Sequence, residues 1–99
     1  MKIMFICTGN ICRSAMAHKL MEKKIVDNDI KNTQVFSCGV FAEDGDGATY
    51  NACEAMEEYG VDLKGHRATN IRSSQIEEMD LILCATRSHK IQFCKCIRI

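Results

Sequence analysis

Three short apolar runs constrain the fold of this chain more than any other feature of its sequence. They span residues 2–7 (KIMFIC), 34–38 (QVFSC) and 79–84 (MDLILC). Runs of this length suit buried strands that are covered on both faces, as the strands of a parallel sheet are. None approaches the roughly 18–20 residues of a membrane-spanning helix, so we expect no membrane segment.

Helical patterns separate these runs. Apolar side chains recur at helical spacing from Ser14 to about residue 26, with lysines and a glutamate between them. A second pattern covers residues 48–59, and Gly60 is placed to end that helix. Ser74 and Glu77 have the spacing of a capping box, which predicts a third, short helix. The alternation of strands and helices predicts one α/β domain with a parallel sheet between layers of helices.

The charge and the cysteines narrow the class of protein. Thirteen basic residues balance thirteen acidic ones, and a chain without net positive charge is a poor candidate for nucleic-acid binding. The seven cysteines are odd in number, and several lie inside the apolar runs. Because the N-terminus also lacks a signal peptide, we expect reduced thiols and a cytoplasmic protein rather than a disulfide framework.

The residues that carry chemistry directly follow the first predicted strand. The segment CTGNICRS, residues 7–14, lies where that strand ends and the first helix begins. Ligands of open α/β sheets bind in this crevice, and the unpaired N–H groups of a helix N-terminus attract an anion such as phosphate. Gly9 and Asn10 are residue types that tolerate a positive φ, so the loop can turn its amides inward.

Cys7 and Arg13 supply this loop with the groups that phosphoryl transfer needs. The guanidinium of Arg13 can hold two phosphate oxygens at once. The loop amides, the helix N-terminus and Arg13 all favour the thiolate form of Cys7, which is a nucleophile. A C-x5-R spacing alone also arises by chance, and its position between a strand and a helix makes it informative. We therefore expect Cys7 and Arg13 to be catalytic.

The segment from Ile6 to Ser14 resembles the signature of the low-molecular-weight protein tyrosine phosphatases. That family also includes bacterial protein-arginine phosphatases and arsenate reductases. The resemblance continues through SCGV (37–40), GVDLKGHRAT (60–69), EEMDLIL (77–83) and SHK (88–90). We interpret residues 1–90 as one domain and residues 91–99 as an atypical tail. The resemblance implies a phosphotyrosine phosphatase I-like fold, a three-layer sandwich with a parallel sheet.

The resemblance also implies how the loop works. Cys7 would form a cysteinyl-phosphate intermediate, and Arg13 would bind the phosphoryl group and stabilise its transition state. The loop amides would hold the phosphate oxygens. The phosphate-binding residues implied in this way are Thr8, Gly9, Asn10, Ile11, Cys12 and Arg13.

Further residues would support the loop. Asn10 would maintain its shape, with the help of Ser37 and His66, and Ser14 would donate a hydrogen bond to the nucleophile. Cys12 would form a reversible disulfide with the nucleophile that protects it from over-oxidation. All these roles are implied by the resemblance.

The C-terminal end departs from the family. The family's general acid is an aspartate in a late Asp-Pro loop, and this chain contains no proline. We also expect the family's last strand and helix to be missing, as in a truncated or frameshifted gene product. Asp44 and Asp46 are expected in a solvated loop, where either could replace the acid only weakly. The third strand would then form an exposed edge that invites dimerisation.

These observations predict a protein tyrosine phosphatase that acts on phosphorylated proteins, with inorganic phosphate as an inhibitor and activity reduced by the missing acid. Ile11 favours phosphotyrosine, because the family's arginine phosphatases typically carry threonine at that position. Phosphoarginine is the alternative substrate, and a phosphate-binding remnant without turnover is the alternative function.

No metal or organic cofactor is expected. Cys94 and Cys96 have only His89 near them in the sequence, whereas a zinc site needs about four ligands. We expect His18 to be an exposed helix residue and His89 to cap a short, solvated helix. His66 is expected to be a structural histidine.

Overall fold

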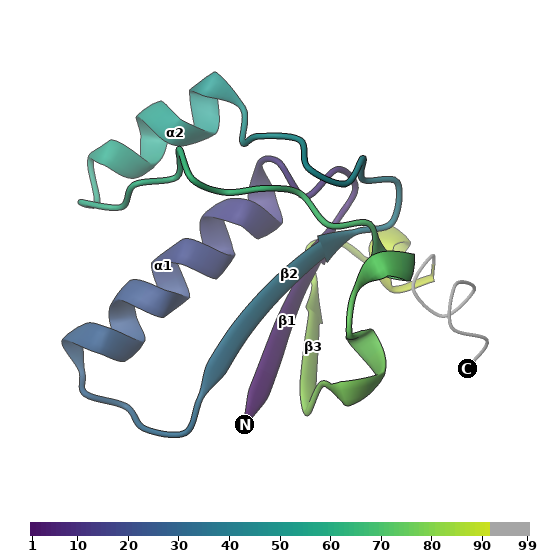
Figure 1. The fold of residues 1–99 in the computed structure, drawn as a ribbon, viewed down its shortest axis with the longest axis horizontal. Coiled ribbons are helices and arrows are strands. Elements are labelled where there is room, and N and C mark those ends of the chain that lie inside the picture. The colour runs from purple at the N-terminus through teal and green to yellow at the C-terminus, as the bar shows by residue number, and fades with distance from the viewer. Residues whose placement is uncertain (92–99) are drawn as a thin grey trace.

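The computed structural model of the chain describes residues 1–91 and has a sheet with helices packed against it (Figure 1). The strands are β1 (Lys2–Cys7), β2 (Gln34–Gly39) and β3 (Leu81–Cys84), and the helices are α1 (Arg13–Asp27) and α2 (Tyr50–Glu57). Two 3₁₀ turns, η1 (Ile71–Ser73) and η2 (Ile76–Glu78), precede β3, and residues 87–91 form one more helical turn. The predicted α/β fold class is confirmed.

The described sheet has the strand order β2-β1-β3, and β1 pairs in parallel with both neighbours. In this register Ile3 stands opposite Val35 on one side and Leu81 on the other. Since β1 is central, its carboxyl end opens onto the middle of the sheet edge where ligands of such folds bind. Cys7 is the last residue of β1.

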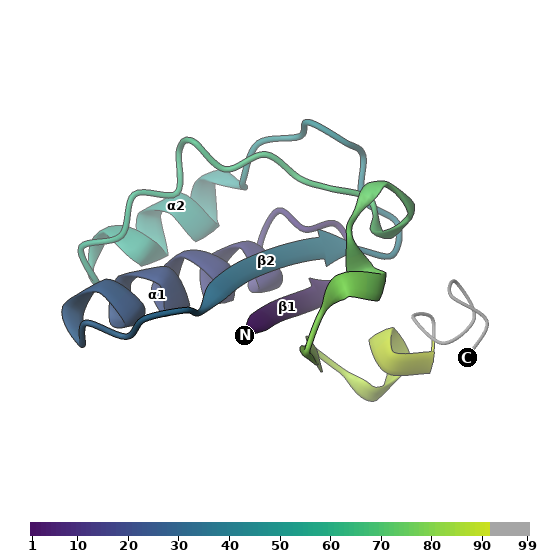
Figure 2. The same cartoon turned by 60° about the horizontal axis from the view of Figure 1, so that its bottom comes forward.

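Side chains of β1 alternate between the two faces of the sheet. Met4 and Ile6 pack with Cys38 against Ile71 and Ile76 of the 3₁₀ turns. The other face carries α1, which lies along the strands, and α2 packs beside α1 (Figure 2). A second apolar cluster joins the two helices; its buried members are Ala15, Ala52, Met56, Val61 and Leu63.

The predicted third helix is absent from residues 74–80, where η2 is the only helical turn. Ser74 caps nothing: its hydroxyl donates to the Ile71 carbonyl at 2.6 Å, and η2 has no side-chain cap. The chain turns earlier instead, because the Asn70 side chain accepts from the N–H of Arg72 and so caps η1. The capping-box prediction is therefore wrong.

The second predicted helix is real but shorter than residues 48–59. The Thr49 side chain accepts from the N–H of Ala52, and α2 ends at Glu57. Gly60 follows with a φ of +71°, the left-handed conformation that a helix-ending glycine commonly adopts.

Strand β3 is less buried than its apolar sequence predicts. Leu81 and Leu83 are 38% and 41% exposed, whereas Ile82 and Cys84 pack against the core. The reason is its place at the edge of the described sheet, since α1 lies over β1 and β2. Only one face of β3 is therefore covered by the described residues.

Residues 92–99 contain most of the predicted tail, including Cys94 and Cys96, and lie outside the described residues. Within residues 1–91, no helix combines the length and the apolar composition that a membrane crossing requires.

Candidate active site

Cys7 lies at the junction that the sequence predicts, between β1 and the loop that leads into α1. Its side chain is 2% exposed. The loop covers residues 8–12, and α1 begins at Arg13, whose side chain is exposed. Cys12 is the half-buried N-cap residue of α1, and no side chain caps this helix. The N–H groups of the first turn of α1, which lie next to Cys7, therefore have no side-chain cap.

The carbonyl groups of residues 7, 8 and 10–12 accept hydrogen bonds from other segments or from the first turn of α1. The N–H groups of residues 40, 41, 49 and 16 donate to the carbonyls of residues 7, 8, 11 and 12, respectively, at 2.9 to 3.0 Å. A ring nitrogen of His66, Nε2, lies 2.6 Å from the carbonyl oxygen of Asn10. The described peptide bonds are all trans, and a trans peptide points its N–H away from its C=O. The N–H groups of residues 8, 9, 11, 12 and 13 are therefore turned to the inside of the loop, where they can hold an oxyanion.

Asn10 maintains this loop with both its backbone and its side chain. It has a φ of +55° and is fully buried. Its Oδ1 accepts from the N–H of Thr69 at 2.9 Å, and its Nδ2 donates to Ser14 Oγ at 2.8 Å. Among the loop residues, Asn10 alone adopts the left-handed conformation. Gly9 does not have a positive φ. Gly9 therefore does not use the conformational freedom for which the sequence singled it out.

The Ser14 hydroxyl links Asn10 to the nucleophile. Ser14 Oγ lies 2.9 Å from Cys7 Sγ, and both side chains are buried. Since Oγ already accepts the amide hydrogen of Asn10, the single hydroxyl hydrogen of Ser14 is free to donate to the sulfur. The Ser14 hydroxyl is thereby placed to donate to the sulfur of Cys7.

Of the two residues expected to help Asn10, the structure places only His66 in contact with it. His66 contacts Asn10 directly, as described above, whereas the Ser37 hydroxyl is paired with His18 Nδ1 at 2.7 Å. The expectation that His18 is an exposed helix residue is wrong, because its side chain is 16% exposed. The rings of His18 and His66 meet edge to face with centroids 6.3 Å apart.

Both histidines favour the neutral form. Burial lowers the pKa of His18 more than the carboxylate of Glu22 raises it. Burial likewise lowers the pKa of His66, and the hydrogen bond to Asn10 only partly offsets this. The structure places His66 against the Asn10 carbonyl, and the structural role expected of it stays a prediction.

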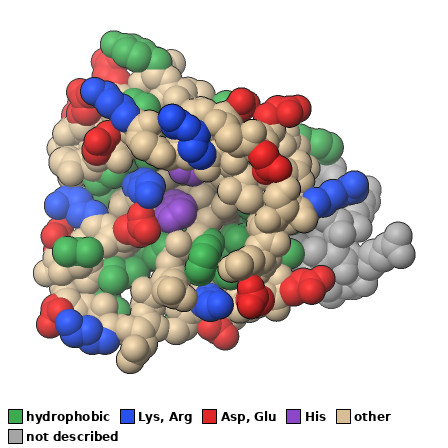
Figure 3. Space-filling view, in the orientation of Figure 1, with side chains coloured by type: hydrophobic (Ala, Val, Ile, Leu, Met, Phe, Trp, Pro, Cys, Tyr) green, Lys and Arg blue, Asp and Glu red, His purple; other side chains and the backbone are tan. Residues whose placement is uncertain are grey.

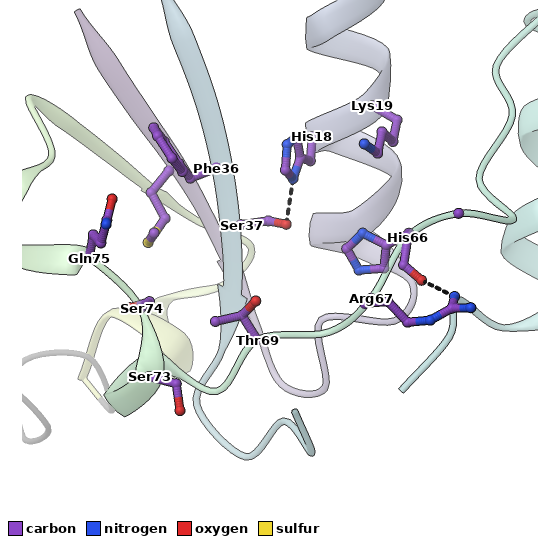
Figure 4. A pocket seen from close by; sticks show the side chains of 12 residues that line it. His18, Lys19, Phe36, Ser37, His66, Arg67, Thr69, Ser73, Ser74 and Gln75 are labelled. Atoms are coloured by element: carbon purple, nitrogen blue, oxygen red, sulfur yellow. Dashed lines mark hydrogen bonds between the residues drawn. The ribbon is translucent and has the colours of Figure 1, made fainter. Parts of the chain in front are cut away.

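A cavity of about 390 Å³ lies behind the loop, between α1, β2 and residues 65–75 (Figure 4). His18, Ser37, His66 and Thr69 contribute to its wall, and Cys7 and Arg13 do not. Histidine side chains are visible near the middle of the face shown in Figure 3, with basic and acidic side chains around them. This cavity is therefore distinct from the inside of the loop, although His66 and Thr69 line the cavity and also bond to Asn10 of the loop.

His89 reaches the loop from the other end of the described chain. It lies in the helical turn after β3, is 5% exposed, and places Nε2 2.7 Å from Thr8 Oγ1. Burial, and then the positive charge of Arg13, lower the pKa of His89. The expectation of a solvated, capping histidine is wrong, because His89 is buried and bonded to Thr8. The sequence does not indicate this contact, since only the fold brings residues 8 and 89 together.

Gly39 is a second residue of the site that the sequence analysis missed. A Cβ at this position would stand 2.5 Å from the Thr8 carbonyl oxygen and 2.8 Å from the Asn10 nitrogen. The end of β2 can lie against the loop only because this residue has no side chain. The sequence marks the SCGV segment only through its resemblance to the family, which does not give this reason.

Asp44 is engaged in a turn rather than free to act as an acid. Its carboxylate oxygens accept from the N–H of Asn70 at 2.6 Å and from Ser73 Oγ at 2.7 Å. The bond from Asn70, and then the bond from Ser73, lower the pKa of Asp44. Asp46 is exposed, and its backbone carbonyl accepts from the N–H of Ala68. Among residues 1–91, no three His, Cys, Asp or Glu side chains gather where they could hold a metal ion.

Comparison with known proteins matches this architecture to one family. The profile described as "Low molecular weight phosphotyrosine protein phosphatase" matches residues 2–98. The chain therefore belongs to the low-molecular-weight phosphotyrosine protein phosphatase family.

Individual relatives are similar in sequence and in structure. A protein-arginine-phosphatase of Bacillus subtilis is 41% identical over 90 residues, which are 91% of this chain and 59% of that protein. A low-molecular-weight protein tyrosine phosphatase from T. tengcongensis superposes with a TM-score of 0.88 at 38% identity, over 96% of this chain and 65% of that one. The YwlE arginine phosphatase, solved as a mutant with a phosphorylated active-site serine, gives a TM-score of 0.89 at 37% identity, over 99% of this chain and 63% of that one. The chain thus spans about 59% of the length of the B. subtilis relative.

Proposed function

We propose that this chain hydrolyses phosphate monoesters of proteins through a cysteinyl-phosphate on Cys7. The observation that carries the proposal is the hydrogen-bonded series from Asn10 through Ser14 to Cys7, with distances of 2.8 and 2.9 Å. It directs a donor at the sulfur inside a loop of inward-facing amides, which is the environment of a thiolate nucleophile. Relatives named as phosphatases support the same reaction class.

The reaction has two displacements at phosphorus. The Cys7 thiolate attacks phosphorus, so that the S–P bond forms and the bond to the leaving oxygen breaks. The loop amides and the Arg13 guanidinium hold the charge on the transferring group. Water then attacks phosphorus, the S–P bond breaks, and the products are inorganic phosphate, a proton and the regenerated thiolate.

The leaving group decides how fast the first displacement is. An acidic phenol departs as its phenolate, whereas tyrosine, with a pKa near 10, requires a proton. Asp44 is not suited to donate it, because its hydrogen bonds favour the ionised form. A general acid contributes about 10²–10⁴-fold. We therefore expect this chain to act faster on acidic aryl phosphates than on phosphotyrosine.

The direct test is hydrolysis of p-nitrophenyl phosphate at mildly acidic pH by the wild type and by Cys7→Ser. Turnover that disappears in the variant supports the proposal. A folded wild-type chain that binds inorganic phosphate without turnover overturns it and supports the alternative, a phosphate-binding remnant. Inorganic phosphate should inhibit the reaction competitively.

For the substrate we propose phosphotyrosine, on the basis of Ile11. Ile11 follows Asn10 in the loop, and its side chain lies 3.4 Å from where a Cβ on Gly9 would stand. Phosphoarginine is the second candidate, because the relative from B. subtilis carries that name. The ratio of kcat/KM for phosphotyrosine and phosphoarginine peptides tests this choice. We expect Ile11→Thr to shift the ratio toward phosphoarginine, and an unchanged ratio contradicts a role for Ile11 in selection.

A further inference from the structure

His89 is bonded at both ring nitrogens. Nε2 lies 2.7 Å from Thr8 Oγ1 in the loop, and Nδ1 lies 3.0 Å from Thr86 Oγ1. The backbone N–H of His89 also donates to Thr86 Oγ1 at 3.2 Å. These three contacts form a short hydrogen-bonded series from the end of β3 to the residue that follows the nucleophile.

The series has a preferred direction. Thr86 Oγ1 accepts the backbone N–H of His89, so its own hydrogen can be donated to Nδ1. With Nδ1 as the acceptor, the neutral ring carries its hydrogen on Nε2 and donates it to Thr8 Oγ1. Burial, and then the positive charge of Arg13 among the described residues, lower the pKa of this ring and oppose a second proton.

Thr8 is thereby held from two sides. Its carbonyl accepts the N–H of Phe41 at 2.9 Å, and with the series in this direction its side chain accepts from His89 Nε2. The residue itself is exposed, so surrounding side chains do little to fix its position. The amides on either side of Thr8 belong to the set that turns inward, and their direction depends on how Thr8 is held.

We propose that His89 is a positioning residue that orients Thr8, and through it the first amides of the phosphate-binding loop. The inference rests on the proposed function, since it assigns His89 a part in binding the phosphoryl group. His89 does not touch substrate; it acts through the Nε2–H to Thr8 bond. Its loss loosens the loop and weakens the binding of phosphate more than it slows the chemical step.

Three substitutions of His89 separate the two ring nitrogens. His89→Gln retains an N–H near the Nε2 position, His89→Asn retains one near Nδ1 only, and His89→Leu retains neither. The probes are the inhibition constant of inorganic phosphate and the KM and kcat for p-nitrophenyl phosphate. We expect Leu and Asn to raise the inhibition constant and KM about tenfold, the effect of one lost hydrogen bond, with a smaller change in kcat. Gln should restore most of the loss, and Lys90→Ala, an exposed neighbour, is the matched control.

A double-mutant cycle with Thr8→Val tests the path of the effect. If His89 acts through Thr8, His89→Leu should have little further effect on phosphate inhibition in the Thr8→Val background. An equal factor in both backgrounds, or equal losses in His89→Gln and His89→Leu, overturns the proposal in favour of simple packing. Nitrogen-15 NMR of the ring provides a readout without substrate: the Nε2–H tautomer is expected, and an Nδ1–H tautomer overturns the assigned direction.

The two proposals fail in different ways. A wild-type chain that neither hydrolyses p-nitrophenyl phosphate nor binds inorganic phosphate overturns the proposed function. The same result also overturns the role proposed for His89, because that role requires phosphate binding. A working wild type whose His89→Leu variant has unchanged phosphate inhibition overturns the role of His89 alone.

Discussion

Gly39 and Thr8 are in contact through their backbones, with no room for a side chain between them. A Cβ on Gly39 would stand 2.5 Å from the Thr8 carbonyl oxygen, closer than non-bonded atoms can approach. The loop of residues 8–12 therefore takes its position from the end of β2 as well as from β1. The contact therefore restricts where the loop of residues 8–12 can lie.

Adding even one methyl group at Gly39 should displace the loop of residues 8–12. We expect Gly39→Ala to displace residues 8–10 and to lower kcat/KM for p-nitrophenyl phosphate at least about tenfold, with about 1–3 kcal/mol of lost stability from overpacking. Gly65→Ala is the matched control, because a Cβ there meets no atom within 4 Å. Steady-state kinetics and thermal unfolding of both variants check this, and equal activities contradict it.

Ser14→Ala should affect both the nucleophile and the loop. The substitution removes the hydroxyl 2.9 Å from Cys7 Sγ, so iodoacetamide should alkylate Cys7 more slowly at neutral pH. It also leaves the buried Nδ2 of Asn10 without its acceptor, at a cost of about 1–3 kcal/mol. Peptide mass spectrometry gives the alkylation rate at Cys7, and urea unfolding gives the stability.

Ser74→Ala is the control for Ser14, since its hydroxyl donates to the Ile71 carbonyl away from the loop. An alkylation rate that is unchanged in Ser14→Ala contradicts the inferred direction of the hydrogen bond. A rate that falls equally in Ser74→Ala shows a general loss of structure instead.

Asp44→Asn should leave activity nearly unchanged. Asp44 is fully exposed, and the N–H of Asn70 and the hydroxyl of Ser73 both favour its ionised form by lowering its pKa. An ionised carboxylate cannot protonate a leaving group. We expect kcat for p-nitrophenyl phosphate and for a phosphotyrosine peptide to stay within about twofold of the wild type, far from the 10²–10⁴-fold of a general acid. A loss specific to the phosphotyrosine peptide assigns Asp44 the acid role after all.

The stability of the fold should decrease as the pH falls below about 6.5. The pKa values of His18, His66 and His89 all lie below their ordinary value of 6.5 in the folded chain. The unfolded chain therefore binds more protons than the folded one in this window, and the free energy of unfolding rises with pH there. Urea unfolding at pH 8, 7, 6 and 5 measures this dependence.

His66→Gln tests whether these histidines are the cause. The glutamine amide can still donate to the Asn10 carbonyl, but it does not titrate. The slope of stability against pH should be shallower in this variant between pH 5 and 7. Asp44 does not explain such a slope, because its hydrogen bonds from Asn70 and Ser73 lower its pKa from an ordinary value that already lies below this window. A slope that does not change in His66→Gln assigns the effect to groups other than His66.

Local patterns in the sequence determined the centre of the molecule. The apolar run 2–7, the turn residues after it and the helical spacing from Ser14 predicted β1, the loop and α1, and the structure places them at Lys2–Cys7 and Arg13–Asp27. Each of these three segments forms between residues that are neighbours in the chain, so the period of the apolar residues and the residue types are sufficient to predict it. For the same reason, sequence alone brought Cys7, Asn10, Arg13 and Ser14 together at the junction of β1, the loop and α1.

Only the tertiary structure decided what surrounds that loop. Thr8 and His89 are 81 positions apart and meet because β3 pairs with β1. Gly39 lies against the loop because β2 pairs on the other side, and Ser37 is bonded to His18 rather than to Asn10 because α1 covers that face. The exposed Leu81 and Leu83 follow from the place of β3 at the edge of the described sheet. Residue type and spacing carry no information on such long-range contacts, since they arise from strand pairing and helix packing.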